Sequence, residues 1–339
     1  MRKVSIAIAL VVVVVGALFA GMALRGHLYN PYKGYEGAEQ FVVIAPGTGT
    51  AAIRRRLVDA GIIRDEVAFR AALWWTGHAL ALQAGEYRFD RPLAAVDVVE
   101  RVARGDVYTR RITFPEGLTI QEMAGIYESR GFGAAADFVE AAANPSPVQA
   151  LDAQAVDLEG YLFPETYTLP RAIPASRLIG MMVDRFLATY TDQWRHAAEE
   201  QGLTMRQVVT LASLIEEETG RSEERPIVAA VYLNRLRIGM RLQADPTVVY
   251  ALRRTGTYDG NIRRDDLALD SPYNTYRYAG LPPGPIAAPG AASLEAVLSP
   301  SRVSYLYFVS RNDGTHAFAN TLAEHNRNVR EFQVLFFRR

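Results

Sequence analysis

The stretch Leu211-Ala-Ser-Leu-Ile-Glu-Glu-Glu-Thr-Gly220 places three adjacent carboxylates at the end of an apolar segment. Thr204 and Gln207 precede it with the spacing of a capping box, which predicts a helix that begins at Thr204. Because successive helical residues lie about 100° apart around the axis, one of the three glutamates must share the apolar side. A carboxyl group held against apolar surface resists ionisation, so it can act as an acid at neutral pH.

A helical wheel separates the three glutamates. With Val208 at zero, Glu218 falls at about 280°, on the apolar side, and Glu217 falls at about 180°, facing solvent. Glu216 falls at about 80°, so Glu216 and Glu218 point about 160° apart and do not grip one substrate atom together. The pattern therefore favours a single catalytic carboxyl group over the carboxylate pair of an ordinary glycosidase.

A structural role for these acids remains an alternative, because Glu216 and Glu218 could pair with nearby arginines such as Arg221, Arg225 or Arg235. A run of acids at the end of a helix also opposes the helix macrodipole. This unfavourable placement modestly favours a functional role.

The composition excludes several classes of protein. A chain of 339 residues predicts two or three domains. With 37 basic and 37 acidic residues, it lacks the basic excess of a nucleic-acid-binding protein. It contains no cysteine, and its five histidines show no zinc-type spacing, so neither disulfides nor a metal is expected. No phosphate-binding loop is present, and we expect no cofactor.

The N-terminus reads as a membrane anchor. Residues 4–24 carry no charge, and a helix over them would span about 31 Å, enough for a hydrocarbon core of about 30 Å. Arg2 and Lys3 precede the stretch, which predicts a cytoplasmic tip and a chain that lies outside the cytoplasm. A cleaved signal peptide is the alternative, but the stretch is long for one.

The remaining chain predicts an α+β fold. Residues 26–40 are rich in Gly and Tyr and are expected to form a short stalk, and Asn144-Pro-Ser-Pro147 marks a boundary between regions 41–145 and 146–339. Expected strands and helices, in chain order, are strands at 41–44, 85–89 and 111–114, helices at 65–75, 175–201, 204–218, 222–236 and 245–252, a hairpin turn at 312–314, and a closing helix at 321–337.

Part of the first region recurs. Phe114, Pro115-Glu-Gly117 and Gly131-Phe132 echo Ile44, Pro46-Gly47 and Gly61-Ile62, and the two glycine pairs are offset by 70 positions. Two related strand–helix units are therefore expected. Such units resemble LysM-type modules, which bind glycans that contain N-acetylglucosamine. Generic α+β packing explains the pattern equally well.

Several segments together resemble the YceG-like (MltG) family of membrane-anchored endolytic murein transglycosylases. The segments that carry the resemblance are Leu211–Thr219, Asn234–Thr247, Tyr273–Tyr276, Gly280–Ile286, Ala288–Gly290 and Tyr305–Val309. In the family's Glu-x-Glu motif the second glutamate is catalytic, which corresponds to Glu218. The family often has Lys between the two acids, whereas this chain has Glu217. That difference removes a positive charge and would raise the pKa of Glu218 further.

The resemblance implies cleavage of the β-1,4 bond between N-acetylmuramic acid and N-acetylglucosamine in nascent glycan strands, with formation of a 1,6-anhydro ring and termination of strand elongation. It implies a single-pass protein of the cell inner membrane with its catalytic domain on the periplasmic side. Peptidoglycan synthases are expected as partners.

Other side chains are candidates for substrate binding or support. Gln243 could orient Glu218 or bind a sugar, and Asp245 is either a ligand contact or a helix N-cap. The remaining candidates are the mixed aromatic and polar run Tyr273, Asn274, Thr275 and Tyr276, with Glu216 and Glu165 as further acids. The alternative reading of the run is a surface turn. Of Trp74 and Trp75, one is expected in the core and one at the surface.

Two other functions remain open at this stage. A non-catalytic glycan-binding scaffold would use the LysM-like region alone. A hydrolytic muramidase would use Glu218 with Glu165 or Asp245 as the second carboxylate.

Overall fold

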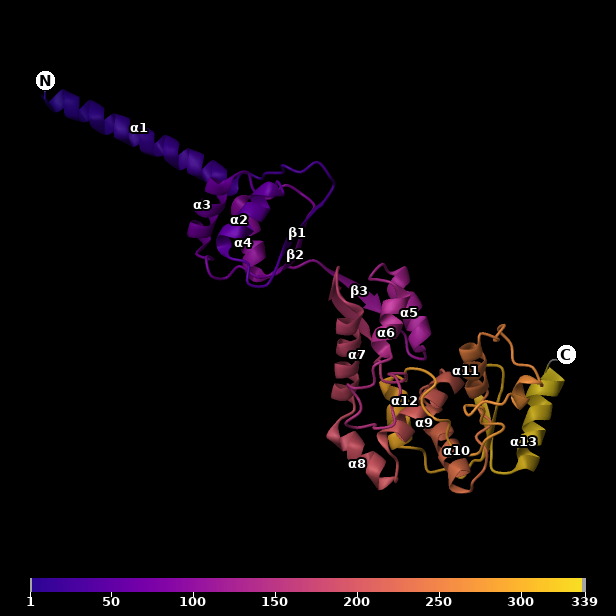
Figure 1. The fold of residues 1–339 in the computed structure, drawn as a ribbon. Helices are drawn as coiled ribbons and strands as arrows, with labels where there is room; N and C mark the ends of the chain where they lie inside the picture. The colour runs from indigo at the N-terminus through magenta and orange to yellow at the C-terminus, as the bar shows by residue number, and fades with distance from the viewer. Residues whose placement is uncertain (1, 337–339) are drawn as a thin grey trace. The chain divides into compact units, whose positions relative to one another are not determined.

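The computed structural model describes residues 2–336, with side chains from residue 10 onward, and the protein is a mixed α+β structure (Figure 1). It forms two compact units. Unit 1 comprises Met1–Arg110 and Thr168–Arg171, and unit 2 comprises Arg111–Tyr167 and Ala172–Arg339. The α+β class predicted from the sequence is confirmed.

Unit 1 begins with the long helix α1 (Arg2–Tyr29). Its segment Leu10–Tyr29 has a mean hydropathy of 1.9 and, by length and composition, is suited to cross a membrane. The N-terminal apolar helix expected from the sequence is therefore present.

The core of unit 1 lies between a two-stranded antiparallel sheet and three helices. Strand β1 (Gln40–Ile44) pairs with β2 (Gly85–Phe89), and Val42 lies opposite Tyr87. Alternate residues of both strands are buried, as the two-residue period of a strand requires. The three helices are α2 (Thr50–Asp59), α3 (Glu66–Thr76) and α4 (Ala95–Arg104).

The segment 26–40, expected as a stalk, packs along unit 1. Leu28 is buried in the core of this unit, and the backbone of Tyr32 pairs with that of Leu93. The Tyr35 hydroxyl donates to the carbonyl of Phe89 at 2.9 Å. These contacts join the end of α1 to the unit, so α1 and unit 1 form one continuous body.

The elements from β3 onward repeat the order that follows α1 in unit 1. Strand β3 (Thr109–Thr113) is followed by α5 (Ile120–Ser129), α6 (Ala135–Ala142), β4 (Thr166–Pro170) and α7 (Ala175–Thr189), and β3 pairs with β4. The division between the two units runs through both strands. Thr119 and Glu122 form a capping box at the start of α5.

The helices that carry the sequence motifs follow. They are α8 (Asp192–Glu200), α9 (Met205–Glu218), α10 (Arg225–Arg237), α11 (Asp245–Thr255), the short η1 (Asp266–Ala268) and α12 (Ala291–Leu298). The prediction of a single helix over 175–201 is wrong, because α7 ends at Thr189 and a new helix begins at Asp192. Thr191 then caps α8 by accepting a hydrogen bond from the Trp194 amide.

The described chain closes with a hairpin and a helix. Strands β5 (Tyr307–Ser310) and β6 (His316–Ala319) pair in antiparallel fashion. Asn312 in the turn has a φ of 65°, which agrees with the predicted hairpin turn. Helix α13 (Leu322–Val329) continues into the π-helix η2 (Arg330–Leu335), and the last residue of the predicted closing helix, Phe337, lies outside the described residues.

Candidate active site

A cleft of about 510 Å³ opens in unit 2 beside the end of α9. One wall comes from the segment before α11, and another comes from the β5–β6 hairpin and α13. Its lining residues are Glu218, Arg235, Leu242, Gln243, Asp245, Tyr276, Phe308, Val309, Ser310, His316, His325 and Gln333.

Glu218 is the last residue of α9, and its carboxyl group faces this cleft. Its Oε1 accepts a hydrogen bond of 2.7 Å from the hydroxyl of Tyr232, a fully buried residue of α10. Burial raises the pKa of Glu218 to about 7, and the charge of Asp245 adds to this effect, while the Tyr232 hydrogen bond opposes it. Near neutral pH the group therefore populates both its protonated and its ionised form.

Arg235 supplies a buried positive charge next to the cleft. Its guanidinium donates to the carbonyls of Leu306 at 2.6 Å and Leu242 at 2.5 Å. It thereby fastens the segment before β5 to the segment before α11. Its charge also lowers the pKa of Glu218, against the effect of burial.

The wall before α11 depends on an unusual backbone bend. Gln243 has a φ of 49°, in the left-handed region that non-glycine residues seldom adopt. The hydroxyl of the buried Thr275 accepts from the Ala244 amide at 3.0 Å, and it lies 2.9 Å from the hydroxyl of Thr247. Thr275 therefore supports the wall from behind, while the Gln243 side chain remains exposed to the cleft.

Asp245 opens α11 and lines the same cleft as Glu218. The N-cap of this helix is Ala244, so the N-cap alternative for Asp245 does not hold. The Asp245 carboxylate instead accepts a hydrogen bond from the hydroxyl of Tyr276. Its place in the first turn of the helix favours a negative charge there.

Of the run 273–276, only Tyr276 lines the cleft. Asn274 is buried and donates to the carbonyls of Leu267 at 3.1 Å and Leu269 at 2.8 Å, so it fixes the preceding loop. The ring of Tyr273 packs against Tyr250 with their centroids 4.9 Å apart. The surface-turn reading thus fails, but so does the expectation that all four side chains meet substrate.

Glu216 has a structural environment. Its Oε1 accepts from Arg225 at 2.7 Å and its Oε2 accepts from the Gly290 amide at 2.9 Å, which ties α9 to α10 and to the start of α12. The Glu217 side chain is exposed, as the helical wheel predicts, although partial desolvation raises the pKa of its carboxyl group to about 7. Glu165 lies outside the cleft in an ion pair of 2.7 Å with Arg185, so it is not positioned as a second acid.

Sequence reasoning named Arg235 only as one of several arginines that could pair with Glu216 or Glu218, and it did not assign Tyr232. Tyr232 and Arg235 lie three positions apart on α10, and this spacing, which places them on one face, was the available signal. His316 pairs with Glu224, with 2.6 Å between its Nδ1 and the carboxylate, and His325 stacks on Tyr307. These histidines reach the cleft only through tertiary folding, and local spacing does not reveal them.

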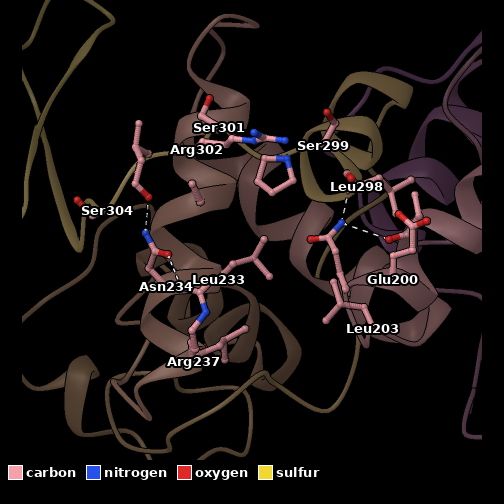
Figure 2. Close-up of a pocket in the computed structure, with 16 residues that line it drawn as sticks. Glu200, Leu203, Leu233, Asn234, Arg237, Leu298, Ser299, Ser301, Arg302 and Ser304 are labelled. Carbon is pink, nitrogen blue, oxygen red and sulfur yellow. Dashed lines mark hydrogen bonds between the residues drawn. The ribbon is translucent and has the colours of Figure 1, made fainter.

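A larger hollow of about 960 Å³ lies elsewhere on unit 2, between α8, α10 and the segment 298–304 (Figure 2). Its amide side chains bind the backbone of that segment. Asn234 donates to the carbonyl of Val303 at 2.9 Å, and Gln201 donates to that of Leu298 at 2.9 Å. Its lining contains one carboxylate, the exposed Glu200. The acid chemistry therefore lies in the smaller cleft.

Comparison with known proteins identifies the family. The model of the YceG-like family matches residues 42–331. The chain belongs to the YceG-like family. This YceG-like protein is 31% identical over 299 residues to a Bacillus subtilis protein named endolytic murein transglycosylase, covering 84% of this chain and 82% of the relative.

A Streptococcus pneumoniae relative of the same name is 28% identical over 328 residues, and the match spans 86% of this chain and 58% of that protein. The crystal structure of a YceG-like protein from Listeria monocytogenes has a TM-score of 0.57 at 31% identity. The structural match covers 86% of this chain and 98% of the Listeria chain. The family inferred from the sequence motifs is confirmed.

Proposed function

We propose that this YceG-like protein is an endolytic lytic transglycosylase of peptidoglycan. It cleaves the β-1,4 bond between N-acetylmuramic acid and N-acetylglucosamine within a glycan strand and leaves a 1,6-anhydro-N-acetylmuramic acid end. Relatives of that name, 28% and 31% identical over most of the chain, support the assignment. The observation that carries the mechanism is the raised pKa of Glu218, about 7, in a cleft that is open to substrate.

Glu218 moves both protons of the reaction. In the first step its carboxyl group donates a proton to the glycosidic oxygen as the bond from that oxygen to the anomeric carbon breaks. In the second step the resulting carboxylate takes the proton of the muramyl 6-hydroxyl, whose oxygen attacks the anomeric carbon. Water is not consumed, so no second carboxylate is required to activate it.

The neighbours of Glu218 suit this double role. A group that acts first as acid and then as base works best when its pKa is close to the working pH. Desolvation and Asp245 raise the pKa of Glu218, while Tyr232 and Arg235 lower it, and the balance is about 7. Asp245 and Arg235 also supply the cleft with one negative and one positive charge, which can stabilise charge that develops in the transition state.

A hydrolytic muramidase is the second candidate, because Asp245 lies in the same cleft as Glu218. In that mechanism Asp245 would activate water or stabilise the cation, and the product would have a reducing end. Glu165 does not support this alternative, since its carboxylate is held by Arg185 outside the cleft.

Mass spectrometry of the products tests both candidates. The full chain is incubated with purified glycan strands, and the wild type should release fragments with 1,6-anhydro ends. Glu218→Gln should fold normally and lose cleavage by roughly 10²-fold or more. Glu217→Gln, a change on the exposed face of the same helix, is the matched control and should cleave.

Each other outcome assigns a different function. Reducing ends would identify a hydrolase, and full cleavage by Glu218→Gln would remove Glu218 from the mechanism. A wild type that binds strands without cutting them would be a scaffold.

The membrane topology is part of the proposal. α1 anchors the protein in the inner membrane as a single span, with Arg2 and Lys3 on the cytoplasmic side and both units on the periplasmic side. The apolar segment Leu10–Tyr29 supports this arrangement. Residues 1–25 form the tip and anchor, and 146–339 form the catalytic domain.

A glycan-binding role for the region 41–145 is also proposed. The segment β1–β2 lies within this region, and the segment β3–β4 begins in it and ends beyond it; both have the order strand–helix–helix–strand, which supports a pair of related LysM-like modules. Peptidoglycan synthases, which make nascent glycan strands, are the proposed protein partners.

A further inference from the structure

Unit 1 exposes an aromatic patch next to the last turns of α1, formed by Tyr29, Trp74 and Trp75. The Trp74 and Trp75 side chains are 76% and 57% exposed. The expectation that one of them would lie in the core is therefore wrong. Large apolar side chains grouped at a surface mark a contact with another apolar phase.

The patch is built on a defined geometry. The rings of Tyr29 and Trp75 meet edge to face with centroids 6.4 Å apart, and Trp74 and Trp75 lie 6.5 Å apart. Trp75 also lines a shallow depression together with Gly21, Leu24, Arg25 and Leu28 of α1. The patch thus adjoins α1 directly.

Two contacts within unit 1 join α3 to the last turns of α1. At the start of α3, Asp65 lies 3.5 Å from His27. At its end, Trp75 packs against Tyr29 and lines a depression with Gly21 and Leu24. The C-terminal end of α3 therefore lies beside the part of α1 in which the apolar segment ends.

The level of the patch along α1 corresponds to a membrane interface. Arg25 is the first charged residue after Lys3, so it marks where the apolar stretch ends. The eight steps along the helix from Gly21 to Tyr29 cover about 12 Å. This range spans the passage from hydrocarbon to headgroups, because each headgroup layer is about 5 to 8 Å thick. Trp and Tyr concentrate at this depth, where an amphipathic ring meets both phases.

The loop after α3 adds an apolar tip. Leu80 is 102% exposed, so its side chain packs against nothing in the protein. The loop follows directly from Gly77, which ends α3 in a left-handed conformation. It therefore lies at the same end of α3 as the tryptophans.

We propose that the aromatic patch and Leu80 insert into the interfacial layer of the phospholipid bilayer and seat unit 1 on the membrane surface. This inference rests on the proposed anchor, because the position of the bilayer comes from α1. The anchor alone would leave unit 1 free to tilt about a single helix. A second contact through α3 fixes its orientation, since α1 is joined to the unit by buried contacts such as Leu28.

Depth-dependent fluorescence quenching tests the proposal on the full chain in phosphatidylcholine–phosphatidylglycerol vesicles. The chain has three tryptophans, so Trp194→Phe leaves only Trp74 and Trp75 as reporters. Lipids brominated near the headgroup end of the acyl chains should remove most of their emission, while iodide in the water should remove little. Trp74→Phe with Trp75→Phe leaves Trp194 of unit 2, which serves as the matched control for collisions that do not depend on insertion.

A single cysteine provides an independent reading, since the natural chain has none. Leu80→Cys, labelled with a polarity-sensitive dye, should show blue-shifted emission in vesicles. Val156→Cys, which is 73% exposed in unit 2, is the control and should report water. Neither substitution removes a packed side chain.

The failures of the two proposals are distinguishable. A chain that does not float with vesicles in a density gradient has no membrane anchor. A chain that floats, but whose Trp74 and Trp75 are quenched by iodide and not by brominated lipid, overturns the interfacial seat alone. If soluble glycan then protects these tryptophans from iodide, the patch is a glycan-binding surface instead.

Discussion

Glu218→Gln should stabilise unit 2 at neutral and alkaline pH, although it removes the proposed catalytic acid. The pKa of Glu218 rises from 4.5 to about 7 in the folded protein, mainly through desolvation. A group with a raised pKa contributes its full stability below pH 4.5 and loses it as the pH rises through 7. Gln is neutral at every pH, and its amide oxygen can still accept the hydrogen bond from Tyr232.

The magnitude follows from the two pKa values. The difference between 4.5 and about 7, at roughly 1.4 kcal/mol for each pKa unit, corresponds to about 3 kcal/mol at pH 8. Water in the cleft reduces this penalty, so we expect a gain of about 2 to 3 kcal/mol in the free energy of unfolding. At pH 4 the wild-type group is protonated in both states, and the gain should vanish.

Glu216→Gln is the matched control on the same helix and should have the opposite sign. Its carboxylate is paired with Arg225, whose side chain is 11% exposed, and it also accepts from the Gly290 amide. Removing one partner of a buried pair leaves the other charge uncompensated and costs about 3 kcal/mol. Glu116, at 3.6 Å from Arg225, offsets part of this loss.

Denaturant unfolding measured between pH 4 and pH 8 provides the assay. In a Trp74→Phe, Trp75→Phe background, the emission of Trp194 reports unit 2. The reasoning is refuted if Glu218→Gln has the same effect at pH 4 as at pH 8, or no effect at pH 8. If Glu216→Gln stabilised unit 2, the ion pair of Glu216 with Arg225 would not be the stabilising contact that we describe.

Three further changes test the cleft. Tyr232→Phe removes the hydroxyl that donates to Glu218 at 2.7 Å. Because a hydrogen bond to a charged group contributes about 1.5 kcal/mol, the pKa of Glu218 should rise by about 1 unit. The alkaline limb of the pH–rate profile, measured as the formation of anhydro ends, should move up by the same amount. Gln243→Gly and Gln243→Ala should both lower kcat/KM, but the glycine variant should be about 1 kcal/mol more stable in denaturant because of the φ of 49°. Thr275→Val leaves the buried Ala244 amide without its acceptor and should lower the free energy of unfolding by about 2 kcal/mol. It should also lower kcat/KM. The control Thr257→Val, at an exposed threonine, should change neither quantity.

Sequence reasoning succeeded where the physics is local. The position of Glu218 on the apolar side follows from the helical period, and the capping box of Thr204 with Gln207 fixes where that period begins. Both signals depend on residues within a few turns. The strand β2 and the turn at Asn312 were predicted for the same reason, since their residues favour those conformations without tertiary help.

Sequence reasoning failed where contacts that are distant in the sequence, or surroundings outside the chain, decide where a helix ends or whether a side chain is buried. Apolar periodicity continued through Tyr190, and it outweighed the N-cap signal of Thr191 that ends one helix and starts the next. Asn274 and Thr275 have the polarity of surface residues, but both are buried. Their side chains form hydrogen bonds with the backbone of a loop and with the hydroxyl of Thr247. Trp74 is exposed, although aromatic residues usually enter a core, and in our proposal it meets the bilayer.

In the proposed mechanism, the environment of Glu218 explains why one carboxyl group serves where many glycosidases use two. Desolvation alone would keep the carboxyl group of Glu218 protonated, so it could not act as a base in the second step. The hydroxyl of Tyr232 and the charge of Arg235 act in the opposite direction, and both come from one face of α10. A carboxyl group balanced near pH 7 can give a proton and take one within a turnover, provided that the substrate brings its own nucleophile. The muramyl 6-hydroxyl meets that condition, so the chemistry of the sugar and the balance at Glu218 require each other.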